Sequence, residues 1–215
     1  MRLVILGPPG SGKGTRAKII GRIFGYPVIT TGAMLRDAVA AGTEYGNVAE
    51  GYMKMGELVR DDIVIGIVEE RLRKPDVEEG FILDGFPRSV NQAKALDRIL
   101  NKMGAILDVV MYVTAKPETI LSRLSLRRSC PKCGAIYHLK DILPKVEGVC
   151  DECGSRLTQR DDDKEEIILH RLEVYAQQTF PILERYERLG KVREVSGELE
   201  IDEIPGEVER VLKGL

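Results

Sequence analysis

Short apolar runs alternate along this chain with longer segments in which apolar residues recur every three or four positions. The first run, residues 3–6, is apolar on both faces, as in a parallel strand buried between two layers of helices. The segment after residue 13 has helical spacing and reaches Gly25, so we expect a helix that packs one face on the sheet and ends there. The apolar residues of this helix are Ala17, Ile20, Ile23 and Phe24.

The alternation continues to the end of the chain and predicts five strands. We expect strands at residues 2–6, 28–31, 80–84, 108–113 and 191–195, and further helices at 61–74, 90–102, 117–127, 160–189 and 204–212. Pro181 should kink or interrupt the helix at 160–189, because proline removes a hydrogen bond and clashes with the preceding turn. Strands separated in this way by helices predict an α/β fold with a doubly wound parallel sheet.

Two segments break the alternation. Residues 32–60 have a helical pattern that four glycines should interrupt, which suits a small mobile insertion better than a layer of the core. These glycines are Gly42, Gly46, Gly51 and Gly56. Residues 130–153 are rich in turns and contain all four cysteines of the chain.

The sequence GPPGSGKGT, from Gly7 to Thr15, lies between the first strand and the first helix. Strand, glycine-rich loop and helix form the context of a phosphate-binding loop, whose backbone N–H groups converge on one point. Lys13 adds a positive charge there, and the helix N-terminus adds the positive end of its dipole. Gly14 takes the place after the lysine, so the hydroxyl is that of Thr15. Similar turns occur in folds that bind no ligand, but the lysine and the flanking elements favour a polyphosphate site.

The cysteines form two Cys-x-x-Cys pairs, each followed by a glycine. Four thiolates at this spacing can complete a tetrahedral shell with no open position, which indicates a structural site for zinc, or for iron in its place. The alternatives are two disulfides, which a cytoplasmic chain disfavours, and a redox dithiol, which the doubled motif disfavours. The expected ligands are Cys130, Cys133, Cys150 and Cys153. His138, between the pairs, is expected to pack or to face solvent rather than to bind the metal.

Arginines flank the cysteine-rich segment on both sides, and two others lie elsewhere. Phosphoryl transfer needs positive charge around the transferred group, and guanidinium groups supply it with directional hydrogen bonds. Solvated surface arginines are the alternative, but placement at both ends of an insertion favours a site. The arginines concerned are Arg36, Arg88, Arg123, Arg127, Arg128, Arg160 and Arg171.

Asp84 ends the third predicted strand, near the sheet edge where ligands bind in this architecture. A carboxylate there can hold Mg²⁺, usually through water, although a turn or N-cap aspartate is the alternative. The chain has only two histidines, and no general base stands out. A phosphate acceptor is already an anionic nucleophile at neutral pH, since its second pKa is about 6. The sequence therefore favours transfer to a phosphate over transfer to a sugar hydroxyl.

Charge and hydropathy exclude some partners. The net charge of −2 gives no global basic field, so we expect no nucleic-acid partner. No apolar run approaches the roughly 20 residues of a membrane-spanning helix, and the N-terminus begins with a strand rather than a secretory leader. We therefore expect a cytoplasmic enzyme without a membrane partner.

In combination, these motifs resemble the adenylate kinases, in the bacterial-type form with a long zinc-bearing lid. The resemblance spans essentially the whole chain and rests on GPPGSGKGT, TTGAMLR from Thr30, GFILDGFPRSVNQA from Gly80, the cysteine pairs and RDDDKEEIILHRL from Arg160. It implies a monomer that catalyses reversible, Mg-dependent phosphoryl transfer from ATP to AMP, giving two ADP. The implied P-loop core, with a five-stranded parallel sheet flanked by helices, spans residues 1–30, 61–126 and 165–215. Two mobile insertions are implied, an AMP-binding one at 31–60 and a zinc-binding lid at 127–164.

The resemblance also implies roles for individual residues. ATP would be bound by Gly10, Ser11, Gly12, Lys13, Gly14, Thr15, Arg123, Arg127 and Tyr137. AMP would be bound by Thr31, Arg36, Glu57, Leu58, Val59, Gly85, Arg88, Gln92, Arg160 and Arg171, with Gln92 reading the adenine edge. The catalytic residues would be Lys13, Arg88, Arg123, Arg160 and Arg171, and Asp84 would hold Mg²⁺ through water. Asp162 and Asp163 match an acidic pair at the lid hinge.

One position departs from the family pattern. The family commonly has TGDMLR, in which the aspartate helps to order Mg-bound water, whereas this chain has Ala33. Asp84 would then act with less help, or the water geometry would differ.

Two other functions stay open at this point. A kinase for UMP, CMP or GMP would share most of the motifs, although Thr31, Gln92 and the long lid favour AMP. A nucleotide-switched binding protein, whose zinc segment docks a partner or nucleic acid, would not need the second arginine set of Arg36 and Arg88.

Overall fold

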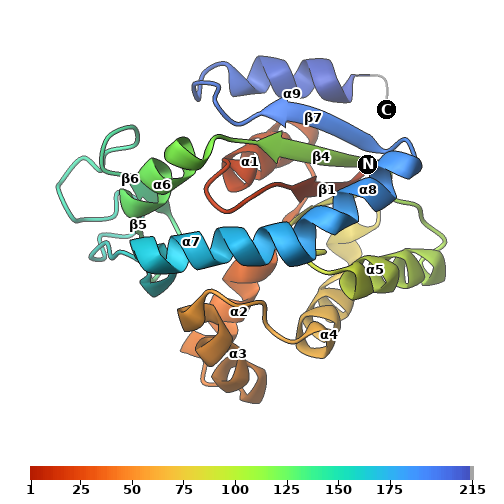
Figure 1. Ribbon diagram of the computed structural model, residues 1–215, viewed down its shortest axis with the longest axis horizontal. Helices are drawn as coiled ribbons and strands as arrows, with labels where there is room; N and C mark the ends of the chain where they lie inside the picture. Colours follow the sequence, from red (N-terminus) through yellow and green to blue (C-terminus); the bar gives the residue numbers. More distant parts are fainter. Residues whose placement is uncertain (214–215) are drawn as a thin grey trace.

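The structure, a computed structural model, describes residues 1–213, so the last two residues of the expected core segment 165–215 lie outside the described residues. Five parallel strands form one sheet in the order β2-β3-β1-β4-β7. Their bounds are β1 (Arg2–Leu6), β2 (Val28–Thr30), β3 (Phe81–Asp84), β4 (Val109–Thr114) and β7 (Val192–Ser196). Helices cover both faces of this sheet (Figure 1). The predicted α/β fold with a five-stranded parallel sheet is confirmed.

The central strand β1 shows how the sheet is held between its two helical layers. Leu3 and Ile5 pack against α1 (Lys13–Phe24) and α9 (Ile204–Leu212). Val4 and Leu6 point to the other face, which is covered by α4 (Asp61–Arg71), α5 (Val90–Lys102) and α8 (Phe180–Arg188). Side chains alternate between the faces of a strand, so a strand buried on both sides must be apolar at every position. This is why the run was visible in the sequence.

A buried ion pair joins the first and last helices. Arg16 of α1 is 1% exposed, and its Nε and Nη2 atoms donate to Glu207 Oε2 of α9 at 3.3 and 3.1 Å. Arg16 Nη2 also donates to the backbone oxygen of Ser196, at the end of β7. Burial lowers the pKa of Arg16, and the carboxylate of Glu207 opposes that shift. The pair thus fixes α9 and the end of β7 to the helix that follows the glycine-rich loop.

The segment predicted as one long helix at 160–189 has three parts. After a 3₁₀ turn at Asp161–Asp163, α7 (Glu165–Val174) leads through a π-helical turn, η3 (Tyr175–Thr179), into α8. Pro181 lies in the first turn of α8. A π turn widens the helix and frees the chain from the i→i−4 bond that proline cannot make. The interruption predicted at Pro181 is confirmed, and the α-helical part begins at Glu165 rather than at residue 160.

Residues 31–60 form two packed helices, α2 (Thr31–Ala40) and α3 (Glu44–Met55). Gly42 lies between them and Gly56 ends α3, but Gly46 and Gly51 lie inside α3, so the interruptions expected at these two glycines were wrong. A Cβ atom on Gly46 would lie 2.1 Å from the backbone oxygen of Ala38, whereas one on Gly51 would meet open space. Gly46 therefore lets the two helices approach closely, a tertiary effect that outweighs its low helix propensity.

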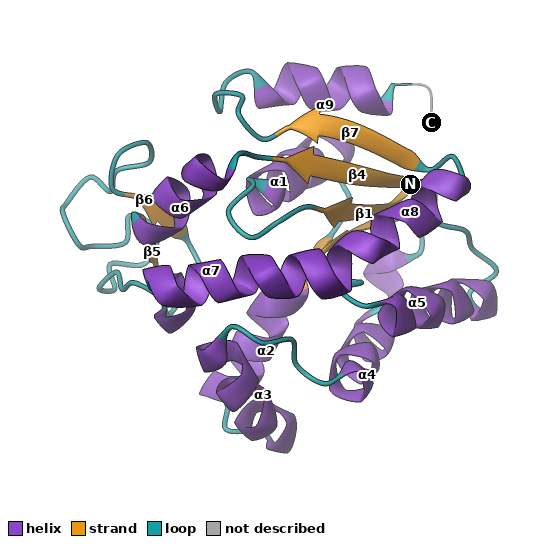
Figure 2. Ribbon diagram, in the orientation of Figure 1, coloured by secondary structure: helices purple, strands orange, loops and turns teal. Residues whose placement is uncertain are grey.

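The cysteine-rich segment follows α6 (Pro117–Ser125) and projects from one end of the sheet (Figure 2). Two short antiparallel strands, β5 (Arg127–Ser129) and β6 (Ile136–His138), form its base. The helix expected at 117–127 ends at Ser125, and β5 was not predicted because its three residues are polar.

A single 3₁₀ turn, η1 (Pro75–Val77), precedes β3. Among residues 1–213, no helix combines the length and apolar character needed to cross a membrane.

The close approach of α2 and α3 gives a test with an internal control. We expect Gly46→Ala to lower the free energy of unfolding by about 1–3 kcal/mol, because its methyl group would overlap the α2 backbone. Gly51→Ala, in the same helix, should be neutral or stabilising by up to about 1 kcal/mol. Urea unfolding followed by circular dichroism measures both variants. Equal stabilities would contradict the packing role of Gly46.

Candidate active site

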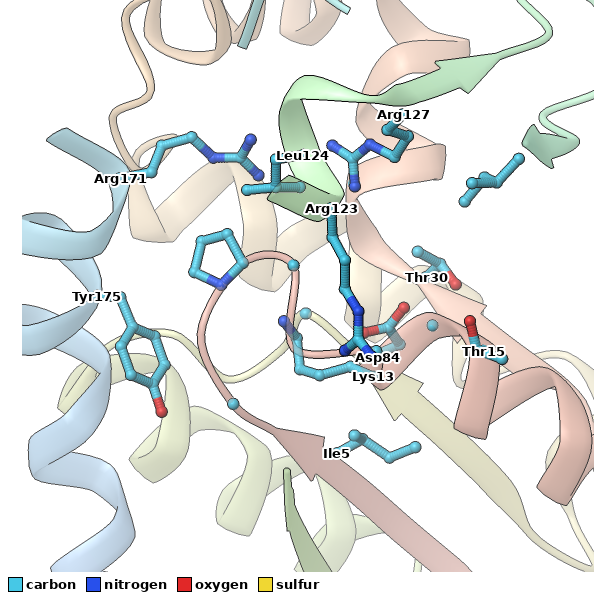
Figure 3. A pocket seen from close by; sticks show the side chains of 18 of the residues that line it. Ile5, Lys13, Thr15, Thr30, Asp84, Arg123, Leu124, Arg127, Arg171 and Tyr175 are labelled. Atoms are coloured by element: carbon cyan, nitrogen blue, oxygen red, sulfur yellow. The ribbon is translucent and has the colours of Figure 1, made fainter. Parts of the chain in front are cut away.

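A cavity of about 730 Å³ opens at the carboxyl ends of the parallel strands, where ligands bind in open α/β sheets. Figure 3 shows Arg127 and Arg171 extending into it from two sides, above the loop that carries Lys13. Ser11 is fully buried and is not among the described residues that line the cavity. The cavity brings together all the other residues predicted to bind nucleotide: Gly10, Gly12, Lys13, Gly14, Thr15, Thr31, Arg36, Glu57, Leu58, Val59, Gly85, Arg88, Gln92, Arg123, Arg127, Tyr137, Arg160 and Arg171, with Asp84.

The loop between β1 and α1 is built for an anion. Gly10 and Gly12 have φ angles of 79° and 92°, in the left-handed region that favours glycine. Gly12 is the N-cap of α1 and supplies no side-chain cap, so the first N–H groups of the helix remain for a ligand. Lys13 Nζ donates to the backbone oxygen of Pro8 at 2.9 Å and is held within the same loop. Free N–H groups, the helix dipole and an ammonium group thus converge.

The environment of Lys13 favours its neutral form. Burial lowers its pKa from 10.5 to about 7, and the nearby Asp84 carboxylate offsets only part of that shift. The arginines at positions 88, 171 and 127 lower the pKa further by repulsion. Because a bound polyphosphate would reverse the balance, the pKa of Lys13 should depend strongly on the ligand.

Positive charge is concentrated in the cavity beyond Lys13. Arg36, Arg88, Arg160 and Arg171 all have lowered pKa values, with burial as the largest cause. For Arg160 the pKa falls to about 9, with Arg127 and Arg36 adding repulsion. Guanidinium groups that have lost water and repel one another attract polyanions strongly.

Three of the arginines that line the cavity are anchored to the protein through Nε. Arg88 Nε donates to the Gly85 oxygen at 3.0 Å, and Arg160 Nε donates to Ser129 Oγ at 3.2 Å. Arg127 donates from Nε and Nη2 to the two carboxylate oxygens of Asp163, at 2.8 and 2.5 Å. Each side chain keeps Nη hydrogens for a ligand. The fork geometry of guanidinium then presents fixed donors to phosphate oxygens.

The acidic residues at 162 and 163 join the start of the cysteine-rich segment to α7. Arg171 Nη1 lies 3.0 Å from Asp162 Oδ2 and 3.3 Å from Asp163 Oδ1. Asp163 also binds Arg127, and its side chain is fully buried. One carboxylate therefore links two arginines from elements that lie 44 positions apart in sequence (171 − 127). The predicted hinge pair indeed contacts the predicted arginines.

The sequence did not predict one part of the cavity lining, the segment that follows β7. This segment lines the cavity with Gly197 and residues 199–202, and Arg123 Nη1 donates to the Gly197 oxygen at 2.7 Å. The sequence could have indicated this segment, because it follows the last predicted parallel strand, whose carboxyl end lies at the sheet edge where ligands bind. Tyr137 also lines the cavity and is only 6% exposed. Its hydroxyl lies 3.6 Å from Cys150 Sγ and accepts the Asp151 N–H at 2.7 Å, so it is also tied to the cysteines.

The four cysteine sulfurs lie within 4.8 Å of one another. A tetrahedral zinc site with bonds of about 2.3 Å places its sulfurs about 3.8 Å apart, so the donor set fits. The two Cys-x-x-Cys turns are also equivalent. The N–H of Cys130 donates to Ala135 at 2.8 Å, and that of Cys150 donates to Ser155 at 2.9 Å. The cysteines could therefore hold one metal ion from two matching turns, and His138 lies outside this set.

Comparisons with known proteins agree on one family. A family model described as adenylate kinase matches residues 5–191. The adenylate kinase of Archaeoglobus fulgidus is 49% identical over 99% of this chain and 98% of its own length. That of Methanothrix thermoacetophila is 50% identical over 99% and 98%, and that of Thermodesulfovibrio yellowstonii is 52% identical over 95% of both chains.

The lowered pKa of Lys13 predicts proton uptake on binding of a nucleoside triphosphate. Above pH 7 the free protein holds Lys13 mostly neutral. A bound polyphosphate favours the ammonium form, so about one proton should be taken up at pH 8, and affinity should fall as the pH rises further. Titration calorimetry in two buffers with different ionisation enthalpies measures this uptake. Lys13→Arg, which stays charged, should abolish it, and an unchanged uptake in that variant would exclude Lys13 as its source.

Proposed function

The chain belongs to the adenylate kinase family, and on that premise we propose that it catalyses reversible, Mg-dependent phosphoryl transfer from ATP to AMP, giving two ADP. The observation that carries the proposal is the distribution of cations in one cavity. The glycine-rich loop with Lys13 lines this cavity together with a second set of cations, Arg36 of α2 and Arg88 before α5. A protein that only binds and hydrolyses one nucleotide has no need of that second set.

We propose that the glycine-rich loop holds the ATP phosphates. Gly10 to Thr15 supply backbone N–H groups, and Lys13 supplies charge. Arg123 and Arg127 complete the ATP side, and Tyr137 and the segment at 199–202 line the same cavity. AMP is assigned to the opposite side, with its phosphate at Arg36 and Arg88. Thr31, residues 57–59, Gly85 and Gln92 form the rest of that pocket.

The proposed chemistry is direct in-line transfer between two bound nucleotides. The acceptor oxygen belongs to a phosphate that is already anionic at neutral pH, so no general base is required. The work of the protein is then to position the two phosphates and to stabilise the charge of the transferring group. Arg123, Arg160 and Arg171, with Lys13 and Arg88, are the groups assigned to that task. Their fixed donors need little reorganisation as charge shifts between oxygens.

Mg²⁺ is assigned to Asp84 through water. The Asp84 carboxylate is largely buried, and its Oδ2 lies 3.4 Å from the place of a Cβ atom on Gly14, beside the phosphate loop. A carboxylate at this position suits a hydrated Mg²⁺ carried by ATP, which would neutralise part of the phosphate charge. Ala33 has no side-chain oxygen, so in our proposal Asp84 is the main protein group that orders the water of the ion.

The core at 1–30, 61–126 and 165–215 is proposed as a fixed frame on which residues 31–60 and 127–164 close. Closure would bring the two phosphates together and exclude water that could hydrolyse ATP. In this structure, α7 of the proposed frame contacts both segments. His170 Nε2 of α7 lies 2.6 Å from Glu57 Oε1, and Arg171 contacts Asp162. The monomeric state and the cytoplasmic location stay predictions.

A phosphoryl-transfer assay tests the proposed function. Purified protein, Mg²⁺ and ATP are mixed with AMP, UMP, CMP, GMP or water, and the nucleotides are separated by chromatography. We expect rapid formation of ADP with AMP and little with water. Preference for another monophosphate would overturn the assignment of the acceptor pocket. Tight ATP binding without transfer to any acceptor would favour a nucleotide-switched binding protein.

Zinc bound by the four cysteines is proposed to be structural, because the segment has only a small apolar cluster of its own. Verified metal removal by a chelator should lower the melting temperature by roughly 5–15 °C, at about 2–4 °C per kcal/mol for a chain of this size. The rate per folded molecule at low temperature should fall less, and added Zn²⁺ should restore the melting temperature. Unchanged melting after removal would argue against a structural metal.

A further inference from the structure

The side-chain amide of Gln92 is held at both ends. Gln92 lies on α5, is 1% exposed and lines the cavity. Its Oε1 accepts the backbone N–H of Arg88 at 2.8 Å, and its Nε2 donates to Asp61 Oδ1 at 2.8 Å. Asp61 is the first residue of α4, and it is not among the described residues that line the cavity.

The two partners of this amide have opposite and invariable polarity. A backbone N–H can only donate, and an ionised carboxylate can only accept. Both therefore demand the same orientation of the amide, with its oxygen toward Arg88 and its nitrogen toward Asp61. Turning the amide over would set its oxygen against the carboxylate and its NH₂ against an N–H, which would leave two buried groups without partners.

Asp61 is itself fixed. Ser89 Oγ lies 2.9 Å from both carboxylate oxygens of Asp61, and the same Oγ accepts the Gln92 backbone N–H at 3.1 Å as the N-cap of α5. The carboxylate also stands in the first turn of α4, where the helix dipole favours negative charge. The tether from Asp61 to Gln92 thus joins the starts of two helices.

We propose that Asp61 is a positioning residue that sets the base specificity of the acceptor pocket by fixing the orientation of the Gln92 amide. This inference rests on the proposed function, in which Gln92 faces the acceptor base. After the two protein contacts, the amide retains one N–H hydrogen and one lone pair in a fixed arrangement. Adenine offers the complementary pair, an exocyclic NH₂ donor beside a ring-nitrogen acceptor.

Hypoxanthine offers the inverse pattern at the same edge. Its 6-position is a carbonyl acceptor and its N1 is a donor, so it would need the amide turned over. A site whose buried polar groups are left unpaired by the wrong substrate rejects that substrate strongly. The tether therefore acts mainly against 6-oxopurines, and loosening it should relax the discrimination without removing any group that contacts the phosphates.

Asp61→Asn tests the inference, because the new amide can offer either a donor or an acceptor to Gln92. We expect kcat/KM for inosine monophosphate, relative to AMP, to rise about tenfold. The KM for AMP should rise more than kcat falls, and the KM for ATP should stay unchanged. The matched control is Asp62→Asn, which removes the same charge from the same helix turn. Asp62 is exposed and pairs with Arg60 rather than with Gln92.

The outcomes separate the inference from the function on which it rests. A wild-type protein that transfers no phosphoryl group to AMP would overturn both. Wild-type activity with an unchanged substrate ratio in Asp61→Asn, or with equal changes in the Asp62→Asn control, would overturn the inference alone. The melting temperature reports whether each variant folds.

A measurement on the wild-type protein covers the case in which Asp61→Asn does not fold. In nucleotide-free protein labelled with ¹⁵N-glutamine, the Nε2 hydrogens of Gln92 should be protected from exchange with solvent, because Asp61 accepts one of them. Exchange as fast as that of an exposed glutamine would overturn the inference.

Discussion

Positive charge held on buried side chains around one cavity is the constraint on which this structure depends. Lys13 and four arginines have pKa values lowered chiefly by burial, so the free protein bears a large desolvation cost around this cavity. Phosphate oxygens offset that cost directly. Burying cations without enough anionic partners costs the fold free energy. A bound polyphosphate would recover part of that free energy, and this favours its binding.

The fold keeps several arginines of the cavity in place through backbone or side-chain partners. The Nε atoms of Arg88, Arg127 and Arg160 are bound by Gly85, Asp163 and Ser129, which come from different segments of the chain. Mutual repulsion would otherwise turn long side chains toward solvent. Since anchoring also removes rotational freedom before any ligand arrives, less entropy is lost on binding. The same contacts therefore serve both stability and preorganisation.

The sequence predicted the sheet and the phosphate loop because both depend on local constraints. A strand buried on both faces must be apolar throughout, and a loop that cradles phosphate requires glycines with positive φ at Gly10 and Gly12. The cysteine cluster followed from spacing in the same way. By contrast, Gly46 looked like a helix breaker because its role depends on the α2 backbone, which only the tertiary structure brings near. Arg16 and β5 were missed for the same reason, since their burial or pairing comes from distant segments.

Residues 31–60 and the cysteine-rich segment, the two insertions of the proposed division, are held together by different interactions. Residues 31–60 bury apolar side chains such as Leu35 and Ala49 in the main core cluster, so packing can hold them. The cysteine-rich segment has a separate cluster of five buried residues, of which two are cysteines. Its strand β5 is polar and contains Arg127 and Ser129, which accepts a hydrogen bond from Arg160. A segment with so little apolar area cannot offset its conformational entropy by burial alone. One contact that restrains it is that of Asp163, which ties Arg127 to Arg171, and the proposed metal ion at the cysteines would be another. The ion pair, together with the metal ion that we propose for the cysteines, would then take the place of a core where charged groups must remain available to the substrate.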